Sequence, residues 1–509
     1  MGRADQPILL PERRIEASVP ASQPLWRGLT GVVVMGFGLR LGVALWSEET
    51  LHPDEVFQYL EQAHRLVFGY GIVPWEYIHG IRSWLLPMLL ALPLWMTHRL
   101  GINDPHLYIP IIQILACWVS LSAIFCTYWI GRQLFTESVG RIASVLTAVW
   151  WEMVFWGHKA TPEILGMYLL LGALACSVSR PNRWVALLFG LCGAGAVALR
   201  LQYAPAVAIL ATLIAIYGWR RWWAPSHLTA AAMGLLAVAL GVGWLDSFTW
   251  GSWWISYANN YLYNRVYGVS SLFGEDPAYF YLLQLGKNSA GLFWVAIAAA
   301  LIFKARQTWL LLALIASLVV PHTLISHKEY RFITAVVPLC LMLVAVVVRD
   351  LWQPEKGVTT GSFWRQPLAV SMSLLPLVGI GSLFAFAERD PGLQAYLYLN
   401  NRPGVISVLN LTDEWFNTGG YYYLHRDVPI HYAEDVADMP PEDWSYYFSH
   451  LIRTGDLEEV PGFHLETQIG DLGLYVATTA PTEPLTDPHR IPSQGGVEGV
   501  YTPRVSPRF

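Results

Sequence analysis

The stretch IPIIQILACWVSLSAIFCTYWIG, residues 109–131, carries no charged side chain. A helix of about 20 predominantly apolar residues can cross the hydrocarbon core of a bilayer, so this stretch predicts a membrane-spanning helix. Further apolar stretches occur near residues 28–46, 83–100, 139–156, 161–178, 184–199, 204–218, 228–246, 290–303, 308–325, 332–349 and 367–387. Together they predict an all-α polytopic membrane protein with about 11–12 transmembrane helices.

The composition agrees with a membrane protein and argues against a nucleic-acid partner. Hydrophobic residues make up 54% of the 509-residue chain and charged residues only 14%, against about 25% in an average soluble domain. The net charge of −5 leaves no basic footprint of the kind that nucleic-acid-binding proteins carry. The cysteines all lie within apolar stretches, so their spacing predicts neither a disulfide framework nor a metal site.

Polar regions interrupt the apolar stretches and define the predicted domains. Two of them, near residues 47–82 and 247–289, are expected to be outer loops. The region after about residue 388 contains the strand-like stretches GVISVLNL, YYYLHRDVPIHY and LGLYVATT, which predict a small α/β or β-rich soluble domain. The predicted segments are a cytoplasmic N-terminal tail, a transmembrane core, a non-cytoplasmic soluble domain and a disordered tail, at residues 1–27, 28–387, 388–480 and 481–509.

Basic residues set the predicted orientation because they collect on the cytoplasmic side of a membrane. Arg13, Arg14 and Arg27 place the N-terminus inside, so the loop 47–82 is expected outside. The charges that follow require that one apolar candidate between residues 83 and 219 does not cross the bilayer.

Two solutions satisfy this requirement. If the proline-containing stretch 83–100 is re-entrant or lies along the outer surface, the segments HKATPE (158–163) and RLQY (200–203) also lie outside. If another short candidate fails to cross instead, those two segments change sides. We favour the first solution, which brings Glu163 and Arg200 to the same face as the first loop.

Charged residues are scarce, and on this topology they collect on the outer face. Such a cluster at the membrane boundary indicates a site where a lipid-borne phosphate meets a polar molecule. A carboxylate supplies a candidate base, while basic side chains donate to phosphate oxygens. The members of the predicted cluster are Asp54, Glu55, Glu76, Arg82, Asp246, His327, Lys328, Glu329 and Arg331.

Each motif also has a purely structural explanation. Pro53, Asp54 and Glu55 are typical of a helix start, where acidic side chains favour the helix dipole. The segment SHKEYRF is compatible with basic side chains that reach toward the interface and pair with their own neighbours. Asp246 would suit a helix cap, and Glu76 with Arg82 a structural ion pair. The grouping on one face favours a site over these separate explanations.

Several segments together resemble a known family. The first outer loop reads HPDEVFQYLEQAHRLVFGYG followed by PWEYIHGIRSWLLP, and the chain continues with DSFTWGSW, NNYLYNRVYGVSSLFGEDPAYFYL and SHKEYRFI. In this order, over most of residues 45–340, they resemble glycosyltransferase family 22, the polyprenyl-phosphate-mannose-dependent mannosyltransferases with a GT-C fold. The segment FWGHKATPEIL departs from the family pattern, so the resemblance says least about the identity of the acceptor.

The resemblance implies an inverting membrane mannosyltransferase whose active site faces away from the cytoplasm. The implied donor is a polyprenyl-phosphate (dolichyl-phosphate-type) sugar, and the implied acceptor is a lipid-linked glycan or glycolipid. The membrane would be the cell membrane in a bacterium and the endoplasmic reticulum membrane in a eukaryote. No cofactor is required, and a divalent cation shared by Asp54, Asp246 and phosphate is a less favoured alternative.

The resemblance also implies residue roles. Asp54 is the expected base, and Glu55 is expected to hold the acceptor or to tune the base by like-charge repulsion. The expected donor-phosphate ligands are His327, Lys328, Arg331 and, in second place, Arg82. The expected substrate-binding residues are Glu76, Tyr77, Asp246, Asn260, Glu329, Glu163 and Arg200.

Other functions remain as alternatives. They are transfer of another sugar, hydrolysis of a lipid phosphate, and, from a different class, a multi-span transporter. Transporters usually show internal repeats and charges near the bilayer midplane, whereas here no repeat is visible and the charges crowd one predicted face. The enzyme hypothesis depends on convergence of Asp54 and Arg331 around one lipid sugar phosphate.

Overall fold

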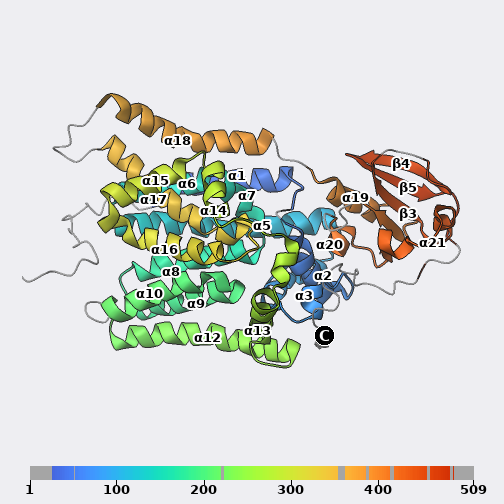
Figure 1. Ribbon diagram of the computed structural model, residues 1–509, viewed down its shortest axis with the longest axis horizontal. Helices are drawn as coiled ribbons and strands as arrows, with labels where there is room; N and C mark the ends of the chain where they lie inside the picture. Colours follow the sequence, from blue (N-terminus) through green and yellow to red (C-terminus); the bar gives the residue numbers. More distant parts are fainter. Residues whose placement is uncertain are drawn as a thin grey trace, which may run out of the picture. The chain divides into compact units, whose positions relative to one another are not determined.

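The computed structural model describes residues 26–50, 52–218, 223–353, 362–385, 389–412, 418–455, 459–481 and 485. These residues are mostly helical and include one small sheet (Figure 1). The predicted N-terminal tail lies outside the described residues up to residue 25, and the predicted C-terminal tail lies outside them except at Pro481 and Leu485.

Membrane helices are present, as predicted. In the described part of the chain, four helices are long and apolar enough to span a bilayer: α1 (Trp26–Trp46), α5 (Pro105–Leu134), α12 (Pro225–Trp250) and α16 (Ala305–Thr323). Two bent pairs, Trp151–His158 with Pro162–Ser177 and Phe280–Asn288 with Leu292–Phe303, raise the number to six if each is one span. Shorter apolar helices occupy Arg183–Leu199, Leu201–Ile216 and Gln366–Gly381, and the total of 11–12 crossings stays a prediction.

The chain divides into two compact units. Among the described residues, those within 1–43, 116–241 and 270–385 form the first, here called the helical unit, and those within 44–115, 242–269 and 386–509 form the second, here called the mixed unit. The further elements of the helical unit are α6 (Glu137–Val149), α7 (Trp151–Phe155), η2 (Trp156–His158), α8 (Pro162–Ser177), α9 (Arg183–Leu199), η3 (Leu201–Tyr203), α10 (Ala204–Leu213), η4 (Ile214–Gly218), α14 (Phe280–Asn288), α15 (Leu292–Phe303), η7 (Tyr330–Ile333), α17 (Val336–Trp352) and α18 (Ser362–Ala385).

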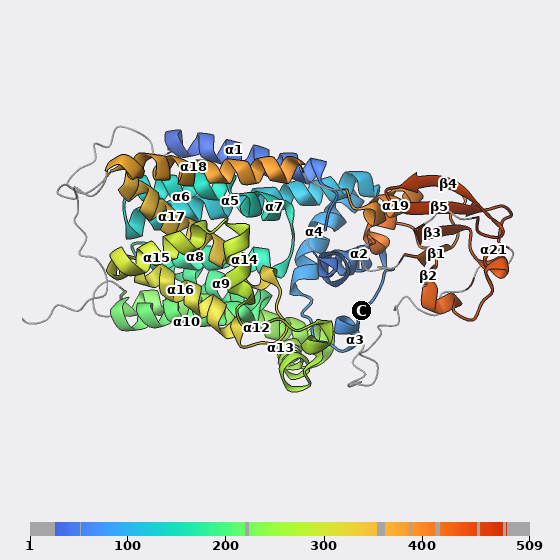
Figure 2. The ribbon, with the colours of Figure 1, turned by 45° about the horizontal axis from the view of Figure 1, so that its top comes forward.

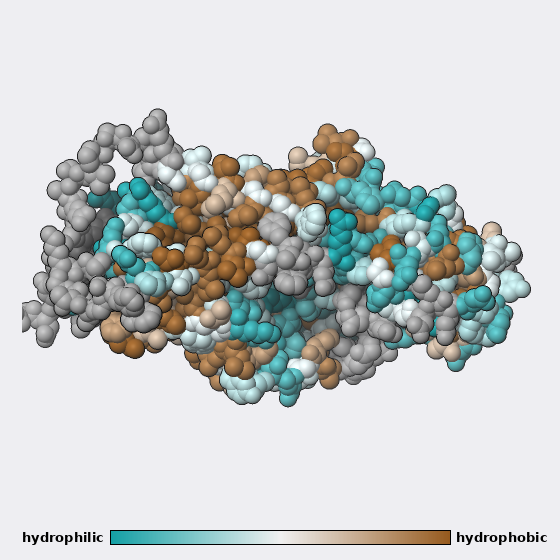
Figure 3. Space-filling model, turned by 90° about the horizontal axis from the view of Figure 1, so that it is seen from above, coloured by the Kyte–Doolittle hydropathy of each residue, from teal (hydrophilic) through white to brown (hydrophobic). Residues whose placement is uncertain are grey.

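Helix α17 forms the core of the helical unit. Its sequence VVPLCLMLVAVVV is apolar on every side, and residues 336–346 are buried. A helix that is hydrophobic all round belongs in an interior, and α17 accordingly packs against α6, α15, α16 and α18 (Figure 2). Helix α18 exposes Leu374, Leu377 and Val378. Figure 3 shows a broad apolar surface on one face of the molecule. Such a surface is expected where helices face lipid.

A buried arginine fixes the break between α6 and α7. Helix α6 ends at Val149, which leaves its last carbonyl groups without intrahelical partners. The fully buried Arg40 of α1 donates hydrogen bonds to the carbonyl oxygens of Thr147 and Ala148 at 3.1 and 3.0 Å. A side chain at Gly157 would collide with Arg40, since a Cβ there would lie 2.5 Å from its Cγ. Arg40 therefore determines how the chain enters η2 and the bend before α8.

The mixed unit combines short helices with the sheet. Its helices are η1 (Glu55–Leu60), α2 (Glu61–Phe68), α3 (Trp75–Ile78), α4 (Leu85–Arg99), α13 (Ile255–Tyr261), η5 (Leu262–Val266), α19 (Pro391–Asn400), α20 (Gly420–Leu424), η9 (Ala433–Val436), η10 (Pro441–Asp443) and α21 (Trp444–Tyr447). Its strands are β1 (Val408–Leu411), β2 (Ile430–Tyr432), β3 (His450–Thr454), β4 (Phe463–Ile469) and β5 (Leu472–Ala477).

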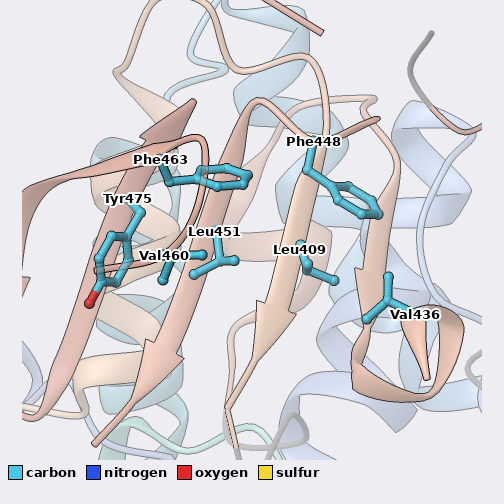
Figure 4. Packing of buried hydrophobic residues seen from close by; sticks show 7 residues of the cluster. All are labelled: Leu409, Val436, Phe448, Leu451, Val460, Phe463 and Tyr475. Carbon is cyan, nitrogen blue, oxygen red and sulfur yellow. The ribbon is translucent and has the colours of Figure 1, made fainter. Parts of the chain in front are cut away.

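The strands form one mixed sheet in the order β2-β1-β3-β5-β4. Strand β1 runs parallel to β2 and β3, whereas β5 is antiparallel to β3 and β4. Parallel strands need a crossover, and α20 lies in the connection from β1 to β2. Side chains such as Leu409, Leu451 and Tyr475 form the sheet's hydrophobic cluster (Figure 4), and α19 packs against β4 and β5.

Candidate active site

Asp54 is the N-cap residue of the π-helical turn η1 in the first loop. The backbone N–H of Asp54 donates to His52 Nδ1 at 3.2 Å, and that of Glu55 donates to the His52 carbonyl oxygen at 2.9 Å. The Asp54 side chain is 20% exposed, whereas Glu55 is only 6% exposed. Since a base must reach its substrate, the more exposed Asp54 is the better placed of the two carboxylates.

Gln58 links three of the predicted residues one turn after Asp54. Its Nε2 donates to Glu76 Oε1 at 2.5 Å, and its Oε1 accepts from Arg82 Nε at 2.9 Å. Its carbonyl oxygen accepts from the hydroxyl of Tyr77 at 2.9 Å, and burial raises the pKa of Tyr77 well above its usual value, so this hydroxyl stays protonated. Glu76 and Arg82 are thus joined through an amide that the sequence did not single out.

The predicted residues of the second loop region hold backbone segments together. Asp246 is fully buried and accepts hydrogen bonds from the N–H and hydroxyl of Ser256, at 2.9 and 2.6 Å. Asn260 donates to the carbonyl oxygen of Ile81 at 3.5 Å, and its neighbour Asn259 donates to the Gly80 carbonyl oxygen at 3.3 Å. The Asp246 contacts join α12 to α13, and the asparagine contacts attach α13 to the end of the first loop.

A chain of charges connects three segments of the helical unit. Arg331 hydrogen-bonds to Glu329 through Nε and Nη2, and its Nη1 lies 3.8 Å from Glu163 Oε1. Arg200 pairs with the same Glu163 oxygen. Glu163 is fully buried and Arg331 is 7% exposed, so water screens these charges weakly. The structure therefore brings together Glu163, Arg200, Glu329 and Arg331, all of which the sequence predicted as site residues.

His327 adds a positive charge to this chain. Its Nε2 lies 2.9 Å from Glu329 Oε1 and its Nδ1 lies 3.0 Å from the carbonyl oxygen of Gly274. Both partners are acceptors, so they favour the imidazolium form, which donates from both nitrogens. The hydrogen bond to Glu329 raises the pKa of His327 accordingly. When His327 is protonated, the group has a net charge of +1, because three cations (Arg200, Arg331 and His327) face two carboxylates (Glu163 and Glu329).

Lys328 is engaged by the backbone. Its Nζ donates to the carbonyl oxygens of Asp276, Ile325 and Ser326, at 2.7, 2.5 and 3.2 Å. A lysine ammonium has three protons, so a phosphate at Lys328 would have to replace one of these carbonyl groups. In this arrangement Lys328 anchors the His327–Arg331 segment.

Two polar side chains in the bend before α8 were not predicted as ligands. His158 is 2% exposed and Thr161 is fully buried. Among the described residues, no hydrogen-bond partner contacts either ring nitrogen of His158 or the hydroxyl of Thr161. Buried polar groups are normally paired, so each is a candidate contact for a polar substrate. The only sign of them in the sequence was their position in HKATPE, the segment that departs from the family pattern.

A comparison with protein-family models matches residues 32–425 to the Alg9-like mannosyltransferase family. This chain belongs to that family. The match includes both Asp54 and the Glu163–Arg331 charges. Membership confirms the resemblance found in the sequence motifs, and it confirms the prediction of a membrane mannosyltransferase.

Individual relatives agree with the family assignment. GPI mannosyltransferase 3 of Yarrowia lipolytica is 25% identical over 427 residues, which cover 78% of this chain and 76% of that protein. GPI mannosyltransferase 3 of Trypanosoma brucei brucei is 26% identical over 478 residues, covering 80% of this chain and 83% of that protein.

Solved structures agree on the fold. ArnT from Cupriavidus metallidurans bound to undecaprenyl phosphate superposes with a TM-score of 0.56 at 10% identity, covering 91% of this chain and 100% of that one. The same protein in the apo state gives a TM-score of 0.54 and 12% identity, covering 89% and 98%. The GT-C type architecture is therefore confirmed, whereas the roles of individual site residues and the convergence of Asp54 with Arg331 stay predictions.

Proposed function

We propose that this protein transfers mannose from a polyprenyl-phosphate donor to a glycolipid of the GPI-precursor type. The Yarrowia lipolytica and Trypanosoma brucei brucei relatives are GPI mannosyltransferases, and the bovine relative, 21% identical, is a GPI α-1,2-mannosyltransferase. The structural neighbour that binds undecaprenyl phosphate supports a polyprenyl-phosphate leaving group. The family match across residues 32–425 is the observation on which the proposal depends.

In the proposed reaction, Asp54 takes the proton from the attacking hydroxyl of the acceptor. The new bond forms between that oxygen and the anomeric carbon, while the bond from the anomeric carbon to the phosphate oxygen breaks. A single displacement of this kind inverts the anomeric configuration and needs only one base. The exposure of Asp54, next to the buried Glu55, supports this division of roles.

The phosphate leaves on its lipid as a dianion or monoanion and requires positive charge rather than a proton donor. The net positive group of Arg200, Arg331 and His327 with two glutamates provides it in a weakly screened position. Arg331 is the proposed principal ligand because a guanidinium can present two parallel donors to phosphate oxygens. This arrangement supplies the charge without a divalent cation.

The bend at His158 and Thr161 is our candidate contact for the sugar hydroxyls. A neutral imidazole and a threonine hydroxyl each donate and accept hydrogen bonds, as sugar hydroxyls do. Both side chains are buried on the same short connection that leads to Glu163. The distribution of basic residues along the sequence supports a reaction on the non-cytoplasmic face.

The proposal is tested with the full-length protein in lipid nanodiscs. Radiolabelled mannose should move from polyprenyl-phosphate mannose to a GPI-type glycolipid acceptor, and a nucleotide-sugar donor should not replace it. Release of free mannose without an acceptor product would indicate a hydrolase. Uptake of substrate into proteoliposomes without any transfer would indicate a transporter, and either result would overturn the proposal.

A further inference from the structure

Glu61 is a buried carboxylate with no role in the proposed chemistry. It is the first residue of α2 and it is fully buried. Helix α2 continues directly from the π-helical turn η1, whose N-cap residue is Asp54, and the two together are here called the Asp54-bearing helix. A buried carboxylate is costly unless hydrogen bonds compensate for its lost hydration. Its partners therefore show what holds this part of the first loop in place.

Three backbone N–H groups surround the Glu61 carboxylate. Ile72 donates to Oε1 at 2.8 Å, and Tyr421 donates to the same oxygen at 3.2 Å. Tyr422 donates to Oε2 at 2.8 Å. Ile72 belongs to the first loop, whereas Tyr421 and Tyr422 belong to α20 in the crossover from β1 to β2. One side chain thus connects the Asp54-bearing helix to the sheet-bearing part of the mixed unit.

Two glycines allow the backbone to approach this carboxylate. A Cβ at Gly420 would lie 2.9 Å from Glu61 Oε2, and a Cβ at Gly71 would lie 2.9 Å from Oε1. Gly420 also has a φ of +56°. Any side chain at either position would push against the carboxylate, so the contact requires glycine on both sides.

Neighbouring contacts hold the same two segments. His64 Nε2 lies 3.0 Å from His425 Nδ1, one helical turn after Glu61 and directly after α20. The hydroxyl of Tyr108 donates to the carbonyl oxygen of Tyr422. Burial lowers the pKa of His64 to about 3, so this pair of rings is neutral and shares a single proton between the facing nitrogens.

We infer that Glu61 is a positioning residue for the transfer reaction. By binding the backbone of α20, its carboxylate fixes the Asp54-bearing helix. The inference rests on the proposed role of Asp54. It assigns a function to the segment 418–425, because α20 is then a required support of the catalytic helix rather than an appended surface element. It also explains in physical terms why the first loop and this distant segment are joined through main-chain donors.

The test compares Glu61→Gln and Gly420→Ala with the double variant. Glutamine presents N–H groups to N–H donors, and an alanine methyl at residue 420 displaces the carboxylate. Each change should lower kcat by about 10- to 100-fold with the donor KM nearly unchanged, because a displacement of about 1 Å at the catalytic group has effects of this size. The double variant should be no slower than the slower single variant, since both changes disrupt one contact.

Matched controls separate positioning from general damage. Gly404→Ala introduces the same alanine at a glycine with a φ of +79° and open space around it, and Glu442→Gln changes an exposed carboxylate. Both controls should keep the wild-type kcat. If Glu61→Gln does not fold, the Gly420→Ala variant decides the question.

Two results would overturn the inference. They are an unchanged kcat in Glu61→Gln and Gly420→Ala, and a double variant whose loss is the product of the single losses. Transfer that survives Asp54→Asn would instead remove the proposed base. The failure of the proposed function is therefore distinguishable from the failure of this inference.

Discussion

Arg331 Nη1 lies 3.8 Å from Glu163 Oε1, and this contact joins the SHKEYRF segment to the start of helix α8. Arg200 shares the same glutamate oxygen, so two guanidinium groups surround one fully buried carboxylate. A buried carboxylate with two cationic partners stays ionised and leaves positive charge available to another anion. The relationship supports a role for Arg331 at the donor phosphate.

Replacement of Arg331 by lysine tests this role. Lysine keeps the positive charge but cannot make the bidentate hydrogen bonds of a guanidinium, so it is not a conservative change at a phosphate site. We expect kcat/KM for the donor to fall about 10- to 100-fold, which corresponds to a charge-assisted hydrogen bond of about 1.5–3 kcal/mol. Steady-state transfer assays at varied donor concentration provide the measurement. The exposed Arg306→Lys is the matched control, and equal activity of the two variants would argue against the role.

Gln58 should matter for stability as well as for activity. Gln58→Ala removes the amide that donates to Glu76 and accepts from Arg82. Loss of a buried partner costs about 1–3 kcal/mol, so the free energy of unfolding should fall by that amount. Denaturation of the purified protein in detergent measures the change, with the exposed Gln353→Ala as the control. A variant as stable as the control would contradict the observed hydrogen-bond chain.

The sequence predicted the charged members of the site because charge is rare in this chain. Glu163, Arg200, Glu329 and Arg331 stood out for that reason, and the structure connects them directly. Gln58 did not stand out, since a neutral amide in a polar loop has no distinctive pattern. Its role appears only when both ends of its side chain are seen to be engaged.

Long-range contacts explain the other differences. The stretch 139–156 was predicted as one apolar helix, but it breaks at Trp150, where Arg40 from a distant helix binds the freed carbonyl groups. The stretch YYYLHRDVPIHY was predicted as strand-like, yet Tyr421–Leu424 is helical and only Ile430–Tyr432 is a strand. Glu61 binds the N–H groups of this helix, a tertiary contact that local propensity does not encode.

Arg40 is expected to be essential for stability. Arg40→Met keeps most of the side-chain length but leaves the carbonyl groups of Thr147 and Ala148 without their donor. Because each buried unpaired group costs about 1–3 kcal/mol, the free energy of unfolding should fall by at least about 2 kcal/mol. Arg141→Met in α6 is the control, since the Arg141 side chain is 69% exposed and its surface pair contributes little. Equal melting temperatures for the two variants would contradict the capping role.

Donor binding should weaken at high pH through His327. The hydrogen bond to Glu329 raises the pKa of His327 in the folded protein. The positive charge of the ring is therefore fully present below the ordinary histidine pKa of about 6.5. That contribution is lost as pH rises through the raised pKa. The donor KM should therefore increase with pH in the wild type, and His327→Gln should remove this step. A KM profile identical in both proteins would show that the imidazolium does not contribute.

Asp54→Asn tests the central claim most directly. Loss of a general base typically lowers the rate about 10²- to 10⁴-fold, so we expect kcat for mannosyl transfer to fall by that factor while the melting temperature stays close to the wild type. The exposed Asp438→Asn should keep full activity. Single-turnover transfer from labelled polyprenyl-phosphate mannose is the measurement. A folded Asp54→Asn protein that transfers mannose at the wild-type rate would contradict the account.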